Sequence, residues 1–268
     1  MKKKYVVLIL VLAVVLLAGT ISWVVWTNTH VKMTTVTVRE SNLPLSFDGF
    51  KIAQVSDLHN SPLWEQTIEL LREAEPNMIM ITGDLVDSRN PDIDTAIAFI
   101  QEAAQIADCF YITGNHEARL PEEDYNRLIS VMDQYGVSVL DNREVKAHRG
   151  GQYISLVGHS WGSTENIGDL STFDGYTILL THQPEGFVDY VSGGYDLVLT
   201  GHVHGGQIRL PLIGGLYAPG QGLFPKYDSG MYTRGDTDMY VSRGIGNSSF
   251  PIRFNNQPEV VLFILERA

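Results

Sequence analysis

The feature that most constrains the fold is an alternation of apolar runs with amphipathic stretches, which begins at Thr34. The first half predicts strands at 34–40 and 50–56, a helix at 62–76, a strand at 77–82, a helix at 92–108, a strand at 109–113, a helix at 121–135 and short strands between 137 and 157. Later apolar runs predict strands at 176–181, 195–200, 239–244 and 258–267, with few helices between them. Two sheets packed face to face, with helices outside, fit this order better than one doubly wound sheet.

Five of these apolar runs end in side chains that can bind a metal ion. The side chains are Asp57 with His59, Asp84, Asn115 with His116, His182, and His202 with His204. A single histidine or aspartate after a strand is usually a capping or turn residue, but five consecutive cases indicate a shared site. Because open sheets bind ligands beyond the carboxyl edge of their strands, we expect these side chains to converge there.

The ligand chemistry indicates two ions. Two aspartates, one asparagine and four histidines are too many for one tetrahedral ion and suit two ions that share a carboxylate. Asp84 is the expected shared ligand, because a bridging ligand must be a charged group with two oxygen atoms and Asp84 stands alone directly after its strand. Without a thiolate, zinc, iron, manganese, nickel and cobalt all remain chemically possible. Two such ions can activate a bridging hydroxide and clamp a transferring phosphoryl group, which predicts hydrolysis.

The ordered motifs D-L-H (57–59), G-D (83–84), G-N-H-E (114–117), H (182) and G-H-V-H (201–204) resemble the calcineurin-like metallophosphoesterase superfamily. Together with "YVSRGIGNSSFPIRFNNQPEV", the segment "GHVHGGQIRLP" resembles more narrowly its membrane-linked bacterial branch of YaeI/YkuE-like phosphodiesterases. The resemblance implies an α/β fold, namely a four-layer α/β/β/α sandwich, with a dinuclear metal site. It implies that one metal is held by Asp57, His59, Asp84 and His204, and the other by Asp84, Asn115, His182 and His202.

His116 matches the family position that contacts the substrate phosphate or protonates the leaving group. It directly follows a candidate ligand, so its ring is expected to point toward the mouth of the site. An imidazole there can bind phosphate or act as a general acid. The alternative is that it only orients Asp57, while the neighbouring Glu117 is expected to be structural.

Weaker signals lie in the second half of the chain. Arg243 and Asn247 are candidate substrate-binding residues, although "RGIG" and "GNS" also make good turns. His159 stands where many relatives carry an acidic residue, and a plain loop histidine is the favoured interpretation. The segment 211–225 is too rich in glycine and proline for regular structure. It is expected to be a loop beside the site that contacts membrane or a lipid substrate, or one that folds against the core.

The N-terminus carries an uncharged apolar segment from Tyr5 to Trp26, long enough to cross a bilayer as a helix. We expect residues 1–30 to be an uncleaved anchor, with a removed signal peptide as the alternative, and residues 31–268 to form the catalytic domain. Three lysines precede the segment and few positive charges follow it, so the catalytic domain is expected outside the cytoplasm, on a single-pass membrane protein.

Composition excludes one class of partner. A formal net charge of −12 argues against binding a nucleic acid polymer. The single cysteine, Cys109, lies in an apolar run and is expected to be buried and structural. Neither observation predicts an oligomeric state.

The sequence therefore predicts a membrane-anchored phosphoesterase that cleaves phosphodiester or pyrophosphate bonds of envelope lipids or nucleotides by attack of a metal-bridging hydroxide. One alternative resembles UDP-diacylglucosamine-type lipid pyrophosphatases, which would act on the cytoplasmic side. Another is a non-catalytic membrane module that senses metal or phosphate. The complete ligand set and the presence of His116 favour the enzyme.

Overall fold

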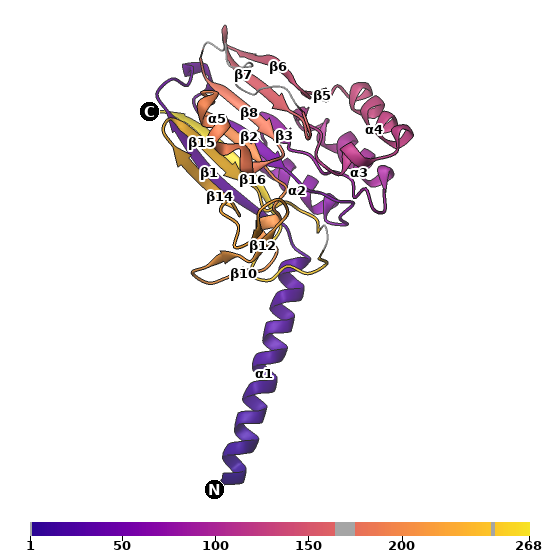
Figure 1. The fold of residues 1–268 in the computed structure, drawn as a ribbon, viewed down its shortest axis with the longest axis vertical. Coiled ribbons are helices and arrows are strands. Elements are labelled where there is room, and N and C mark those ends of the chain that lie inside the picture. The colour runs from indigo at the N-terminus through magenta and orange to yellow at the C-terminus, as the bar shows by residue number, and fades with distance from the viewer. Residues whose placement is uncertain (1, 164–174, 248–249) are drawn as a thin grey trace.

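The computed structural model describes residues 2–163, 175–247 and 250–268. A long helix, α1 (Lys2–Asn28), projects from one end of a body built on two sheets (Figure 1). The window of α1 that is apolar enough to cross a membrane has none of its surface buried against the body. This matches the length and position of the expected apolar span.

The first sheet has the strand order β1-β16-β2-β3-β4-β5. Its strands are β1 (Lys32–Glu40), β2 (Phe50–Val55), β3 (Met78–Ile81), β4 (Asp108–Tyr111), β5 (Ser138–Val139) and β16 (Glu259–Arg267). β2, β3, β4 and β5 run parallel to one another, and β16 pairs antiparallel with β2.

The second sheet has the order β14-β15-β9-β8-β7-β6. Its strands are β6 (Arg143–Arg149), β7 (Gln152–His159), β8 (Thr177–Thr181), β9 (Leu197–Thr200), β14 (Gly230–Arg234) and β15 (Thr237–Val241). β7, β8, β9 and β15 are parallel, and the edge strands β6 and β14 are antiparallel to their neighbours.

Helices cover the outer faces of the two sheets. The first sheet is covered by α2 (Trp64–Ala74), α3 (Ile93–Ala103) and α4 (Glu122–Gln134), and the second by the short α5 (Phe187–Ser192). Short 3₁₀ turns are η1 (Leu45–Phe47), η2 (Glu117–Arg119), η4 (Pro184–Gly186) and η5 (His204–Gly206). The expected four-layer α/β/β/α arrangement is confirmed, with a thin outer layer on the second sheet.

Alternation along the strands explains why both faces of each sheet are apolar. In β3, Ile79 and Ile81 pack against the outer helices, while Met78 and Met80 pack between the sheets. Successive strand residues point to opposite faces, so a continuous apolar run supplies both cores.

The expectation that 211–225 lacks regular structure was wrong in part. The segment and its approach form two small hairpins, β10 (Arg209–Leu210) with β11 (Gly214–Gly215), and β12 (Tyr217–Ala218) with β13 (Gly222–Leu223). Gly214 and Gly222 adopt the positive backbone φ angles that such tight turns need, at 92° and 74°. Strand β14 was also absent from the sequence-based expectations.

Strand direction places the functional edge of the body next to α1. β1 begins four residues after α1 ends, and it runs parallel to β16. Because β2 is antiparallel to β16, the strands β2, β3 and β4 all run back toward the end of the body from which α1 leaves. Their carboxyl ends, where Asp57, Asp84 and Asn115 follow, therefore lie at the anchor end.

Side-chain contacts join the end of α1 to the body. The Asn28 amide group donates to the Arg253 carbonyl (2.7 Å) and accepts from the Arg253 N–H (2.7 Å). The Trp23 ring packs edge-on against Phe254, with centroids 5.6 Å apart. These contacts fix where the helix leaves the body.

Candidate metal centre

The side chains that follow the five central strands all lie in one buried cluster. Those predicted as ligands or as the acid are each at most 6% exposed, namely Asp57, His59, Asp84, Asn115, His116, His182, His202 and His204. They come from the ends of β2, β3 and β4 in one sheet and of β8 and β9 in the other. The structure therefore brings together every predicted ligand, although their role as ligands remains a prediction.

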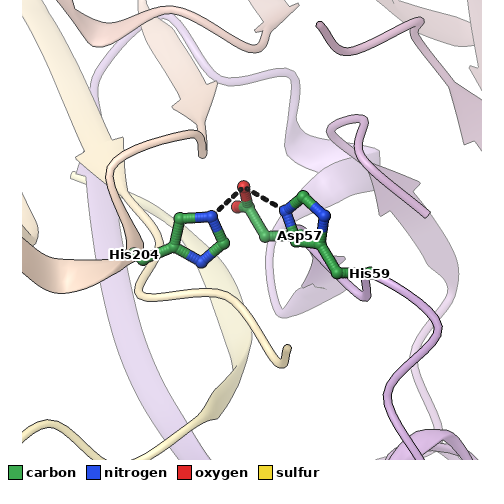
Figure 2. Close-up of side chains that lie close together, drawn as sticks. All are labelled: Asp57, His59 and His204. Carbon is green, nitrogen blue, oxygen red and sulfur yellow. Dashed lines mark ion pairs between the residues drawn. The ribbon is translucent and has the colours of Figure 1, made fainter. Parts of the chain in front are cut away.

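One group of ligand atoms surrounds Asp57. The Oδ1 atom of Asp57 lies 3.8 Å from His59 Nε2 and 3.6 Å from His204 Nε2. Figure 2 shows the two imidazoles on either side of this carboxylate. Their atoms lie within 4.8 Å of one another, close enough to share an ion.

A second group surrounds Asp84. Asp84, His182 and His202 also offer ligand atoms within 4.8 Å of one another. Asp84 Oδ2 lies 3.1 Å from His182 Nε2 and 3.5 Å from His59 Nε2, so it faces members of both groups. This position is the one required of a shared ligand.

The structure passes a direct test of fit for metal ions. Asn115 is 4% exposed, and its Oδ1 atom has no hydrogen-bond partner in the part of the chain that the structure describes. A buried, unsatisfied carbonyl oxygen is costly, and a cation would satisfy it. The His182 Nδ1 atom bonds the Thr82 carbonyl oxygen (2.6 Å), which assigns the proton to Nδ1 and leaves the Nε2 lone pair for a ligand role.

A strained backbone holds these ligand candidates. Asp57, His59, Asp84, His202 and His204 all have positive φ angles, between 46° and 73°. The left-handed region costs an L-residue roughly 1–2 kcal/mol, and such strain gathers at functional sites. These conformations lower the stability of the fold. They are therefore explained by the positions that they give to the ligand candidates.

Two glycines allow the loops to approach one another. A Cβ atom on Gly114 would lie 2.3 Å from Asp84 Oδ1, and one on Gly201 would lie 2.5 Å from Asp57 Oδ2. Any side chain at these positions would displace a candidate ligand, so the glycines are explained by close approach.

Glu117 is structural, as expected, and it joins two of the ligand loops. Its buried carboxylate accepts the backbone N–H groups of Asp84 (2.8 Å), Val86 (3.1 Å) and Gly114 (3.1 Å). Burial, together with the nearby Asp84 charge, raises the pKa of Glu117 to about 7. Its contribution is to hold the Asp84 and Asn115 loops in register.

Electrostatics favour the ligand-competent form of most members. Burial lowers the pKa of His202 to about 4 and that of His204 to about 3, so both imidazoles are neutral near pH 7. Burial alone would raise the pKa of Asp57, but the nearby His204 holds it well below its usual range. Burial also disfavours the charged form of His182, yet attraction to Asp84 raises its pKa to about 10. The negative charge of Asp84, which retains a proton on His182, would also attract a metal cation.

His116 lies beside the two groups and lines the pocket above them. The Ser88 N–H donates to His116 Nδ1 (3.0 Å), which assigns the proton of the neutral ring to Nε2. Asp87 Oδ1 is 3.3 Å from the same nitrogen and favours the opposite tautomer. The Ser88 contact decides the tautomer, because a backbone N–H has a fixed direction. The Asp87 carboxylate, in contrast, already accepts hydrogen bonds from the Arg89 side chain with both of its oxygen atoms.

A third set of potential ligand atoms, from His59, Asp87 and His116, meets the same 4.8 Å criterion. It shares His59 with the first group, and its other two members are engaged by Ser88 and Arg89. These contacts orient His116 in the pocket.

The pocket over the ligands has a volume of about 310 Å³. Besides the predicted residues it is lined by Arg89, Arg119 and Trp161, which were not singled out from the sequence, and by Pro219 and Gly220 of the segment 211–225, which was expected to lie beside the site. The Trp161 ring packs 4.8 Å from the His202 ring. Of these lining residues, Arg119 could have been predicted from the sequence, because it lies in the motif "GNHEAR" three residues beyond His116.

The weaker candidates lie elsewhere. Arg243 faces Glu259, with Nε 4.0 Å from its carboxylate, and Asn247 accepts from Arg253 Nε (3.0 Å). Neither lines the pocket, so their role in substrate binding remains a prediction. His159 is the last residue of β7 and is buried, so the expectation of a plain loop histidine was wrong.

Arg253, a buried residue whose side chain lies next to the ligand candidate His204, was not identified from the sequence. It is 1% exposed, and its guanidinium donates to the carbonyl groups of Arg243 and Gly246 and lies 3.5 Å from His204 Nδ1. Its backbone holds Asn28, so one residue joins the end of α1 to a candidate ligand.

Comparisons with known proteins agree with this geometry. A sequence model for the family described as calcineurin-like phosphoesterase matches residues 50–206. The chain is 32% identical to the uncharacterized metallophosphoesterase YkuE of Bacillus subtilis, over 88% of this chain and 86% of that protein. It is 29% identical to phosphodiesterase YaeI of Escherichia coli, over 81% and 82% of the two chains. The solved structure of TT1561 from Thermus thermophilus has a similar fold, with a TM-score of 0.50 at 14% identity over 73% of this chain and 90% of that one.

Proposed function

Since the chain belongs to the calcineurin-like phosphoesterase family, whose members are metal-dependent hydrolases of phosphoester bonds, we propose that it cleaves phosphodiester or pyrophosphate bonds at a two-metal centre. The observation that carries the proposal is the pair of aspartate–histidine groups that meet at Asp84 beneath the pocket. Asp57, His59, Asp84 and His204 would hold one ion. Asp84, Asn115, His182 and His202 would hold the other.

Two ions bound there would supply an activated water molecule and positive charge for the phosphoryl oxygens. The residues of the chain would position the substrate over them. His116 would donate its Nε2 proton to the departing oxygen, since Ser88 fixes the ring by its other nitrogen. The acid form would be the imidazolium, whose Nδ1–H would face Asp87 Oδ1 at 3.3 Å. Donation from Nε2 would leave the neutral ring, which burial favours because it lowers the pKa of His116.

Arg119 would bind an anionic group of the substrate at the pocket wall. It is exposed and lines the pocket, and its side chain forms no ion pair within the described residues. A guanidinium is well suited to phosphate because its planar donors match phosphate oxygens. Arg89, the other arginine of the wall, already engages Asp87.

Removal of metal tests this proposal. The full chain, treated with a chelator and then dialysed, should lose hydrolysis of methyl nitrophenyl phosphate, and one or more of Mn, Fe, Zn, Ni or Co should restore it. Metal analysis of the restored protein should approach two ions per chain. Full activity in the metal-depleted protein, or saturation at one ion, would contradict a two-metal centre.

We further propose that residues 1–30 anchor the protein in the cell membrane by a single span and that residues 31–268 form the catalytic domain outside the cytoplasm. α1 supports the anchor by its length and exposure. Lys2, Lys3 and Lys4 support the orientation, because positive residues are retained on the cytoplasmic side.

Protease protection tests the orientation. Protease added to intact spheroplasts should digest the catalytic domain, whereas a cytoplasmic marker protein should remain whole. Protection of the domain until lysis would reverse the topology. The cytoplasmic UDP-diacylglucosamine-type lipid pyrophosphatase would then become the better candidate.

A further inference from the structure

The end of the body that carries α1 also exposes an apolar surface. Seven large apolar side chains there are at least half exposed, and we call them the apolar rim: Leu212, Ile213, Tyr217, Leu223, Phe224, Phe250 and Ile252. Five belong to the two small hairpins that contain β10 to β13. Figure 1 shows β10 and β12 at the end of the body beside the top of α1. Exposed apolar surface of this extent usually marks a contact with a partner or a membrane.

The backbone at two rim positions is held in an unfavourable conformation. Leu212 has φ 68° and is fully exposed, at 108% of its reference area, and Phe224 has φ 54° and is 61% exposed. Glycine or asparagine would adopt these left-handed conformations at lower cost. An outward leucine and phenylalanine at such positions favour a function for the apolar side chains themselves.

The position of α1 identifies what covers the rim. Ile252 is followed directly by Arg253 and Phe254, the two residues that contact Asn28 and Trp23 at the end of α1. We propose that the apolar rim is embedded in the leaflet from which α1 emerges, as a second contact between the body and the bilayer. A formal net charge of −12 opposes attraction to anionic lipid, so burial of apolar side chains would supply the contact.

The rim also lies next to the metal pocket. Pro219 and Gly220, which line that pocket, belong to the β12–β13 hairpin that carries Tyr217 and Leu223. The strands that deliver the ligand candidates end at this same edge of the body. With the rim embedded, the pocket opens at the membrane surface, and its substrate is the phosphoester headgroup of a membrane lipid. This substrate class rests on the proposed function, whereas the embedding of the rim does not.

A cavity within the same surface suits an acyl chain. It has a volume of about 310 Å³ and is lined by Ile208, Leu216, Tyr217 and Phe250, together with Gly206 and Gln207. Gly206 lies two residues beyond His204, so the cavity is close in sequence to the metal centre. A lipid held there would have its headgroup near the pocket.

Site-directed labelling tests the contact in the full chain. Leu212→Cys and Phe224→Cys would each be labelled with bimane in vesicles of phosphatidylcholine with or without brominated acyl chains. Cys109 is 2% exposed and should stay unlabelled, which the unsubstituted chain checks. Both labels should be quenched by brominated lipid. The matched control is Leu45→Cys, 67% exposed in η1 beyond the far end of β1, which should not be quenched.

A label at Leu12→Cys, in the middle of α1, separates the rim from the anchor. Quenching at Leu12 without quenching at Leu212 or Phe224 would overturn the rim contact and leave the anchor intact. Labels on the rim that are shielded from water but not quenched would assign the rim to a protein partner, which would also overturn the inference. An effect of high salt on the quenching would contradict the apolar contact.

A pair of esters with the same reacting group tests the substrate class. Methyl nitrophenyl phosphate is soluble, and hexadecyl nitrophenyl phosphate partitions into vesicles. The double variant Leu212→Ser/Phe224→Ser should hydrolyse the methyl ester at the rate of the parent and the hexadecyl ester about tenfold more slowly. Although α1 still anchors the chain, the rim no longer holds the pocket at the bilayer surface, so the effective concentration of lipid substrate at the pocket falls. The double variant Leu45→Ser/Val188→Ser, which removes exposed apolar side chains elsewhere, should leave both rates unchanged.

Equal losses on both esters would mean that the substitutions disturb the site, and would overturn the inferred substrate class. If the parent hydrolyses neither ester with any metal, the proposed function fails. The quenching result would still decide whether the rim contacts the bilayer, so the two failures are distinguishable.

Discussion

Asp84→Asn is expected to abolish most of the activity, with a fall in turnover of roughly 10³-fold or more, because several kcal/mol of transition-state stabilisation depend on both ions. Asp84 is 1% exposed and faces His182 at 3.1 Å and His59 at 3.5 Å, one from each group. The asparagine amide is neutral and binds cations more weakly than a carboxylate. The substitution should therefore weaken the binding of both ions. Asp57 Oδ1 also lies 3.9 Å from His182 Nε2, but Asp84 is the closer of the two carboxylates to that histidine, so Asp84 should be the most sensitive ligand candidate.

Metal analysis alongside turnover checks this expectation. The variant should bind fewer than two ions per chain under conditions that saturate the parent. Asp92→Asn serves as the matched control, since Asp92 caps α3 through Thr95 and lies outside the site, and it should keep both ions and full turnover. Two full equivalents in Asp84→Asn, with unchanged turnover, would remove Asp84 from the shared position.

His116→Ala should lower turnover by about 10²–10⁴-fold on a substrate with a poor leaving group and keep two ions per chain. The ring lines the pocket and Ser88 fixes its Nδ1 atom, so Nε2 is the nitrogen that can protonate a leaving oxygen. On an activated nitrophenyl ester the loss should be much smaller, because that leaving group needs little protonation.

The comparison of alkyl and aryl esters, with metal analysis of the same preparations, is the measurement. His148→Ala is the control, since His148 is an exposed histidine in β6, and it should not change either rate. An equal loss on both esters would exclude the general-acid role and leave phosphate binding or positioning. Loss of metal from His116→Ala would instead support the third group of potential ligands, with His59 and Asp87.

Local sequence patterns were enough to predict the two-sheet architecture. Runs such as "NMIMIT" and "CFYIT" are apolar at nearly every position, which requires burial on both faces of a strand, and β3 and β4 are buried in that way. The same patterns failed at the segment 211–225, because its hairpins depend on glycine φ angles and pairings that leave no periodic signal.

The candidate ligands were also accessible from sequence, because each directly follows an apolar run and parallel strands end at one edge. Asp87 and Trp161 were not, since their place around the site depends on how separate loops pack. Arg253 is a further case. It lies in a segment with glycine, proline and asparagine and no periodic pattern. Only the structure shows that its side chain is buried and that its guanidinium lies beside His204.

The sequence by itself determined which residues form the central strands, which polar side chains end them and that an apolar span precedes them, because these properties are local in the chain. Only the tertiary structure decided that the ligand edge lies at the anchor end. That result depends on β16, the last strand of the chain, pairing parallel with β1 and antiparallel with β2. Strand direction is set by pairing between residues more than 200 positions apart, as in Lys32 with Glu259, and no local pattern records it.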